Sequence, residues 1–125
     1  MKDINLTNNL KQSEIACKCG CGKNDIAPLL PHLFQKARDM FGKPILITSG
    51  CRCEKNNKLA GGKPDSGHLR GLALDLTCKD PNEFNLAHLN HCLTKAGFER
   101  IGLNEAKRFI HVDIDTSKPA CFFKY

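Results

Sequence analysis

The chain has 125 residues, a length typical of one domain with a single modest core. Its 19 Lys and Arg against 13 Asp and Glu give a net charge of +6, and 41% of the residues are hydrophobic, a composition that excludes a disordered chain. No apolar run approaches the ~18 residues needed to cross a bilayer, and the opening MKDINLTNNLKQ lacks the apolar segment of a secretion signal. We therefore expect a monomer without membrane insertion that is cytoplasmic when synthesised.

The positive charge predicts weak attraction to polyanions without identifying one. The basic residues do not form a block, and the chain has one Tyr and no Trp on which bases could stack. Nucleic acid is therefore not an expected partner.

Eight cysteines are many for a chain of this length, and they indicate disulfides, bound metal or small buried side chains. Three of them lie in CKCGCG at residues 17–22 and two in GCRC at residues 50–53, whereas Cys78, Cys92 and Cys121 stand alone. We expect the N-terminal triplet to be tied to a cysteine in the body of the domain, by a disulfide or by a structural metal.

The order of predicted elements indicates an α+β fold. Residues 1–24 are polar and then rich in Cys and Gly, which predicts an arm outside the core, and residues 25–125 form the single domain. A helix capped by Asp25 would bury one apolar face and end at Gly42. That face consists of Leu30, Phe34, Ala37 and Phe41.

The rest of the chain alternates between strands, loops and a second helix. Short strands are predicted over 44–48 and 71–77, separated by a long loop over 51–70, and a helix capped by Asp80 ends at Gly97. A hairpin then joins strands over 99–103 and 109–115. These elements predict a small, mostly antiparallel sheet of about four strands with two main helices.

Three polar residues stand out by their type and position: His68, Asp75 and His111. Alternation places Asp75 and His111 on the polar faces of otherwise apolar strands, an unfavourable arrangement unless something binds there. Two imidazoles and a carboxylate are ligands that zinc accepts, and three protein ligands leave a fourth position open, as in catalytic sites. The alternative for any single histidine is an ordinary hydrogen-bonded side chain. The trio points to hydrolysis, with the zinc site on the sheet face.

The segment from Ser66 to Asp75 matches the pattern S-x-H-x-x-G-x-A-x-D, and FIHVD over 109–113 supplies a second histidine strand. Together with ITSGCR over 47–52, these motifs resemble the LAS superfamily of zinc metallopeptidases over roughly residues 26–115. That group includes D-alanyl-D-alanine carboxypeptidases, phage L-alanyl-D-glutamate endopeptidases and the hedgehog signalling domain. The resemblance implies that one catalytic zinc is bound by His68, Asp75 and His111.

The resemblance also implies a catalytic acid shortly before the second histidine. Many members place it three residues earlier, where this chain has Arg108, which cannot accept a proton. Glu105 matches a hedgehog-like spacing and is the expected general base, with Asp113 as runner-up or as a partner that orients an imidazole. Arg52 is expected to engage substrate and stabilise the developing oxyanion, and Ser66 to contact substrate or a ligand.

The function that follows from the resemblance is hydrolysis of peptide bonds in bacterial peptidoglycan, by a D,D-carboxypeptidase, a D,D-endopeptidase or an L-Ala-D-Glu endopeptidase. Such an enzyme would act on the cell wall after release or lysis, as an endolysin does. Two other readings stay open. The alternatives are a non-catalytic zinc-binding module on the same fold and an adaptor in a virion.

Overall fold

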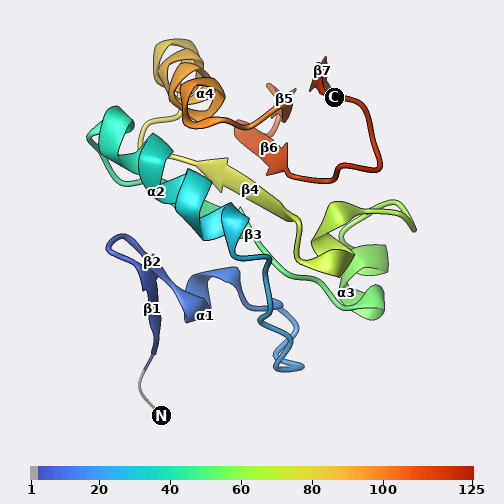
Figure 1. Cartoon of the computed structure of the whole chain (residues 1–125). Helices are drawn as coiled ribbons and strands as arrows, with labels where there is room; N and C mark the ends of the chain where they lie inside the picture. Colours follow the sequence, from blue (N-terminus) through green and yellow to red (C-terminus); the bar gives the residue numbers. More distant parts are fainter. Residues whose placement is uncertain (1–2) are drawn as a thin grey trace.

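The computed structural model describes residues 3–125, and a five-stranded mixed sheet lies at its centre (Figure 1). The strand order is β3-β4-β6-β5-β7, and all neighbours are antiparallel except β5 and β7. The α+β class is confirmed. The strands are β3 (Leu46–Ser49), β4 (Ala73–Thr77), β5 (Arg100–Asn104), β6 (Phe109–Asp113) and β7 (Cys121–Lys124).

The predicted count of about four strands is wrong, because β7 adds a parallel edge strand beside β5. Its four residues are mostly exposed and follow Pro119, so they show no alternation of apolar and polar side chains. The predicted long loop over 51–70 is also wrong. It contains helix α3 (Glu54–Leu59) and the 3₁₀ helix η1 (Gly67–Arg70).

Helices α2 (Leu29–Phe41) and α4 (Glu83–Ala96) pack against each other on one face of the sheet (Figure 1). Their starts differ from the prediction. The chain enters α2 from Pro28 rather than Asp25, and α4 is capped by Asn82, whose side-chain oxygen accepts the Asn85 N–H at 2.8 Å. The predicted apolar face of α2 is buried as expected.

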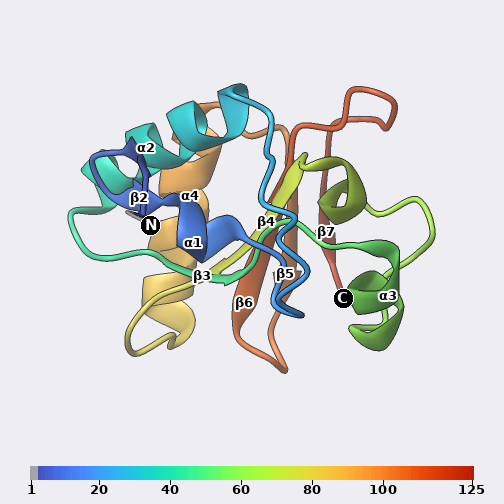
Figure 2. The same ribbon diagram turned by 90° about the horizontal axis from the view of Figure 1, so that it is seen from below.

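The two faces of the sheet have opposite character. Four fully buried side chains of β4 and β6 face the helices: Leu74, Leu76, Ile110 and Val112. The alternating positions carry Asp75, His111 and Asp113 to the other face. Figure 2 shows α3 on the opposite side of the sheet from α2 and α4, so the polar face of the sheet is the one on the side of α3.

The N-terminal segment forms a hairpin of β1 (Asn5–Thr7) and β2 (Leu10–Lys11), followed by the short helix α1 (Gln12–Ile15). Leu10 and Ile15 are fully buried in the main core, so the prediction of an arm outside the core is wrong at these positions. The backbone N–H of Cys51 donates to the Ile15 carbonyl at 2.8 Å, which fixes this segment beside β3. Across residues 3–125, no helix has the length and apolarity that a membrane crossing needs.

Candidate metal centre

The sheet register brings two of the three predicted ligands together. Asp75 on β4 and His111 on β6 are direct cross-strand partners. His68 comes from η1, which is capped by Ser66: the Ser66 hydroxyl accepts the His68 backbone N–H at 3.2 Å. One donor atom from each of His68, Asp75 and His111 lies within 4.8 Å of the others. The structure therefore assembles the predicted trio.

Hydrogen bonds fix which nitrogen each imidazole presents to the centre. Nδ1 of His68 lies 2.7 Å from the Gly50 carbonyl, which can only accept, so Nδ1 carries the proton and Nε2 is left facing Asp75. Nε2 of His111 lies 2.8 Å from Asp113, which leaves Nδ1 facing Asp75. The distances from Asp75 Oδ1 to these two free nitrogens are 3.2 and 3.0 Å.

This arrangement fits a cation. In the neutral imidazoles both facing nitrogens are acceptors, and the Asp75 carboxylate is also an acceptor, so three lone pairs converge with no proton among them. A positive charge placed between them would satisfy all three. Two imidazole nitrogens and a carboxylate oxygen are a donor set that suits Zn²⁺.

The pKa shifts show the same need for positive charge. Burial disfavours ionisation of Asp75, but the neighbouring His111 and His68 imidazoles together outweigh burial and hold the pKa of Asp75 well below its ordinary range. Burial likewise disfavours the charged form of His111, yet the neighbouring carboxylates of Asp113 and Asp75 raise its pKa. Asp75 thus stays ionised, and its negative charge favours a cation at the centre.

Arg52 is held against the outer oxygen of Asp75. Its Nη2 lies 3.2 Å from Asp75 Oδ2, its Nε donates to the Ser49 hydroxyl at 3.0 Å, and its Nη1 donates to the Asn57 side chain at 3.2 Å. Ser49 is the β3 residue opposite Asp75, and Asn57 lies on α3. Three contacts from three elements therefore fix the guanidinium beside the metal centre.

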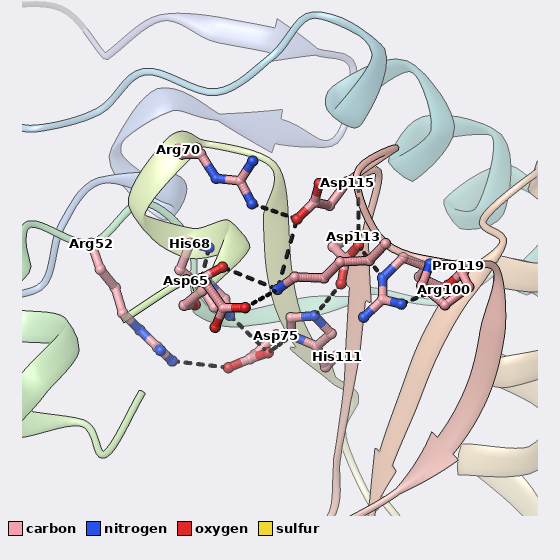
Figure 3. Close-up of polar contacts among 12 residues, drawn as sticks. Arg52, Asp65, His68, Arg70, Asp75, Arg100, His111, Asp113, Asp115 and Pro119 are labelled. Atoms are coloured by element: carbon pink, nitrogen blue, oxygen red, sulfur yellow. Dashed lines mark hydrogen bonds and ion pairs between the residues drawn. The ribbon is translucent and has the colours of Figure 1, made fainter. Parts of the chain in front are cut away.

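Asp113 bridges the centre to a second arginine (Figure 3). One oxygen faces His111, and the other accepts from Nε of Arg100 at 2.7 Å and from the Asp115 backbone N–H at 3.1 Å. Burial disfavours its ionisation, but hydrogen bonds from His111 and the Asp115 backbone, together with the charges of His111 and Arg100, outweigh burial and lower the pKa of Asp113. Figure 3 shows Arg52, Asp75, His111, Asp113 and Arg100 linked in that order.

A cavity of about 690 Å³ opens beside the centre. Arg52 and Asp75 line it from one side and Arg108 and Lys107, from the turn between β5 and β6, from another. Lys18, from the N-terminal segment, lines it as well. Among the described residues of the lining, Asp75 is the one carboxylate, so the cavity is strongly basic.

Glu105 lies outside this lining. It is in the turn between β5 and β6, its side chain is 62% exposed, and its carboxylate lies 2.8 Å from Nζ of Lys124 on β7. The structure therefore does not bring Glu105 into contact with the predicted ligands. An exposed ion pair of this kind contributes little to stability, so little energy holds Glu105 there.

The structure adds residues that sequence reasoning missed. Arg100 holds Asp113 and lies in no recognisable motif, whereas Asn57, which holds Arg52, lies in a stretch that resembles the S-G-x-R…N…G-G pattern of the peptidases. Phe123 of β7 packs over Gly102, and its ring centroid lies 6.0 Å from that of His111. Tyr125 is largely exposed and contacts Phe123 and Phe109 through its ring. For Arg100 the signal was its place opposite Asp113 in the predicted hairpin.

Comparison with known proteins agrees with this geometry. Residues 8–113 match the model of the family described as Peptidase M15. A search of curated proteins gave no match. The matched range covers most of the chain and includes His68, Asp75 and His111, and it confirms the resemblance found in the sequence. The chain therefore belongs to the Peptidase M15 family, which makes it a member of a family of zinc-dependent peptidases.

Proposed function

We propose that the protein is a zinc-dependent peptidase that cleaves the stem peptides or cross-links of bacterial peptidoglycan and acts after release or lysis of the cell. The observation that carries the metal assignment is the convergence of His68 Nε2 and His111 Nδ1 on Asp75, with the N–H of each ring bonded elsewhere. When bound by these three residues, Zn²⁺ supplies Lewis-acid activation of water and of a carbonyl group.

The substrate class is supported by the charge of the cavity. Lys18, Arg52, Lys107 and Arg108 all line it. Stem peptides carry free carboxylates at D-glutamate and at terminal D-alanine, and arginine pairs with carboxylates through two parallel hydrogen bonds. A cavity with four cations around one buried, already paired carboxylate would therefore favour an anionic peptide.

Each remaining residue has a proposed task. Arg52 keeps its guanidinium at the edge of the centre, where it would bind the substrate carbonyl as negative charge develops on the oxygen. Ser66 positions His68 through its cap, and its contact with substrate stays a prediction. Glu105 would take the proton from the attacking water after leaving Lys124, and it would return that proton to the leaving amine.

Asp113 is the other candidate for that proton. Both of its oxygens already accept hydrogen bonds, from His111 and from Arg100, which favours a role in holding the imidazole over one in accepting a proton from water. Glu105→Gln separates the two: we expect zinc binding to be retained and hydrolysis to be lost. Lys124→Gln is the matched control, since it breaks the same ion pair but keeps the carboxylate.

A second candidate function has one observation in its favour. Arg108 occupies the position where many relatives place the catalytic acid, and Asp75 is the one carboxylate in the described cavity lining. A non-catalytic module that binds zinc and an anionic ligand would have this lining.

The deciding experiment is digestion of purified peptidoglycan with the zinc-loaded protein, followed by mass spectrometry. We expect fragments that are absent with His68→Ala and present with His91→Ala, an exposed histidine on α4. Free D-alanine would identify a carboxypeptidase, and a split at L-alanine an endopeptidase. A folded, zinc-containing sample that releases no fragment would contradict the peptidase and support the non-catalytic module.

A further inference from the structure

A second group of metal-binding side chains lies apart from the His68, Asp75 and His111 centre. Cys17, Cys19 and Cys21 of the N-terminal segment meet Cys53, the residue that caps α3, and one sulfur from each lies within 4.8 Å of the others. We propose that these four residues, the four-cysteine cluster, bind one Zn²⁺ ion as a structural site. The proposal concerns the fold and does not depend on peptidase activity.

The sulfur spacing suits a shared ion. The Sγ atoms of Cys17, Cys19 and Cys53 form a triangle with sides of 3.4, 3.6 and 3.8 Å. A tetrahedral ion with Zn–S bonds of about 2.3 Å separates its sulfurs by about 3.8 Å. A disulfide would bring one pair to about 2.0 Å and leave the others apart. Three nearly equal distances therefore match ligands around a common centre.

The backbone folds so that alternate residues present their sulfurs on one side. The N–H of Cys17 donates to the Lys23 carbonyl at 2.7 Å and closes a loop over 17–23. Within it, Gly20 and Gly22 have φ angles of 80° and 90°, values that other residues rarely adopt. These two turns explain how a C-x-C-x-C sequence can place three thiols around one point without the C-x-x-C spacing of common zinc sites.

Backbone N–H groups already point at two of the sulfurs. The N–H of Cys53 donates to Cys17 Sγ at 3.5 Å, and the N–H of Asn56 donates to Cys53 Sγ at 3.4 Å. Donors of this kind stabilise the negative charge of metal-bound sulfur. On binding, each thiol would release its proton to the solvent and form an S–Zn bond, so no oxidant is needed. Four thiolates in a tetrahedral arrangement favour zinc over magnesium or calcium.

The cluster would fix two cations at the edge of the basic cavity. Lys18 stands between Cys17 and Cys19, and Arg52 directly precedes Cys53; both line the cavity. The same ion would join the N-terminal segment to the start of α3, which carries Asn57, a partner of Arg52. The structural site would thus hold parts of the cavity wall that come from distant stretches of the chain.

The other cysteines provide matched controls. Cys51, Cys78 and Cys92 are buried and Cys121 is exposed, and none of the four belongs to the cluster. Cys121→Ser therefore removes an accessible thiol without touching the proposed site. Cys19→Ser combined with Cys21→Ser removes two exposed ligands and leaves the buried Cys17 in place.

The test is metal analysis of the full chain, purified under reducing conditions, loaded with zinc and dialysed. We expect two zinc ions per chain in the wild type and in Cys121→Ser, and one ion in the Cys19→Ser/Cys21→Ser variant. His68→Ala should also hold one ion, now in the cluster. Replacing that ion with Co²⁺ should give a sulfur-to-cobalt charge-transfer band in the near ultraviolet, which nitrogen and oxygen ligands do not produce.

Thiol labelling of the wild type covers the case in which a variant does not fold. In the zinc-loaded protein Cys19 and Cys21 should resist a thiol reagent despite their exposure, and a chelator should restore their reactivity to that of Cys121. Equal reactivity of all three with zinc present, iron in place of zinc, or a mass lowered by disulfide formation would each overturn the proposal. Two zinc ions in the Cys19→Ser/Cys21→Ser variant would also overturn it, whereas a single ion in the wild type that His68→Ala retains and the double variant loses would support the four-cysteine cluster and contradict the catalytic centre.

Discussion

Replacement of Asp113 by Asn tests how the second imidazole is held. The wild-type carboxylate accepts from His111 Nε2 at 2.8 Å through one oxygen and from Arg100 Nε at 2.7 Å through the other. An asparagine side chain has one acceptor oxygen and one NH₂ group, which can only donate. Whichever way the amide turns, one N–H partner therefore meets a donor, and one of the two hydrogen bonds is lost.

The expected effect is a weaker zinc site. A hydrogen bond to a charged group contributes about 1.5–3 kcal/mol, and loss of a carboxylate behind a ligating histidine typically lowers metal affinity about 10–100-fold. The two figures agree, because each tenfold change corresponds to about 1.4 kcal/mol. We therefore expect Asp113→Asn to bind zinc about 10–100 times more weakly while keeping most of its turnover once zinc is saturating.

The assay is zinc titration against a competing chelator, followed by peptide hydrolysis at saturating zinc. Asp65→Asn is the matched control, since that carboxylate is 69% exposed and contacts Lys118 at the surface; its zinc affinity should not change. Unchanged zinc affinity in Asp113→Asn, combined with collapse of turnover at saturating zinc, would refute the reasoning. Asp113 would then be the proton acceptor and not the residue that orients His111.

Three further predictions concern residues around the metal centre and the contacts that they make. Gly71 and Gly42 have similar positive φ angles of 67° and 71°, but a Cβ at Gly71 would lie 2.4 Å from the Asp25 carbonyl oxygen, whereas nothing lies within 4 Å at Gly42. We expect Gly42→Ala to lower the free energy of unfolding, measured in urea, by about 1 kcal/mol and Gly71→Ala to lower it by about 3 kcal/mol. Equal losses of stability would contradict the close contact at Gly71. The Ser117 hydroxyl and the Arg70 guanidinium lower the pKa of Asp115 to about 2 from 3.8, so its stabilisation is present above about pH 4 and lost as the pH falls through about 2. Asp115→Asn should accordingly lower the melting temperature at pH 7, with the difference from wild type shrinking toward pH 2; a difference independent of pH would argue against this pairing. Arg52→Lys should retain zinc but lower kcat by about 10²–10³, because a lysine ammonium cannot make all three contacts that orient the Arg52 guanidinium. A wild-type kcat in the zinc-loaded variant would show that Arg52 does not bind the transition state.

The parts of the fold that follow strong periodicity were predictable. The apolar face of α2 and the alternation in β4 and β6 decide which side chains are buried, and the structure agrees. The starts of the helices were not, because Asp25, Asp80 and Asn82 are all plausible caps and the choice depends on how the chain enters from its neighbours. β7 was missed for a similar reason: its pairing with β5 is long-range and leaves no local pattern.

The candidate site, too, could be predicted from the sequence only in part. The ligand trio could be predicted because its spacing is a motif and two members are cross-strand partners. The supporting contacts could not, since the bond from His68 to the Gly50 carbonyl and that from Arg52 to Asn57 depend on how the segments over 50–70 fold back on each other. Glu105 was chosen by spacing alone, and its side chain depends on the conformation of an exposed turn. Its role as general base stays a prediction.

The contact of Gly50 with Ile15 bears on how far the chain can be trimmed. A Cβ at Gly50 would lie 2.5 Å from the Ile15 carbonyl oxygen, and Ile15 and Leu10 are both fully buried. Removing these two side chains would forfeit about 1.5–3 kcal/mol each, against a total stability of about 5–15 kcal/mol for a domain of this kind. Gly50, whose carbonyl accepts the His68 Nδ1–H, would also lose its contact with Ile15. The smallest autonomous form of this peptidase therefore begins well before residue 25, and a shortened version meant for engineering must carry the first helix with it.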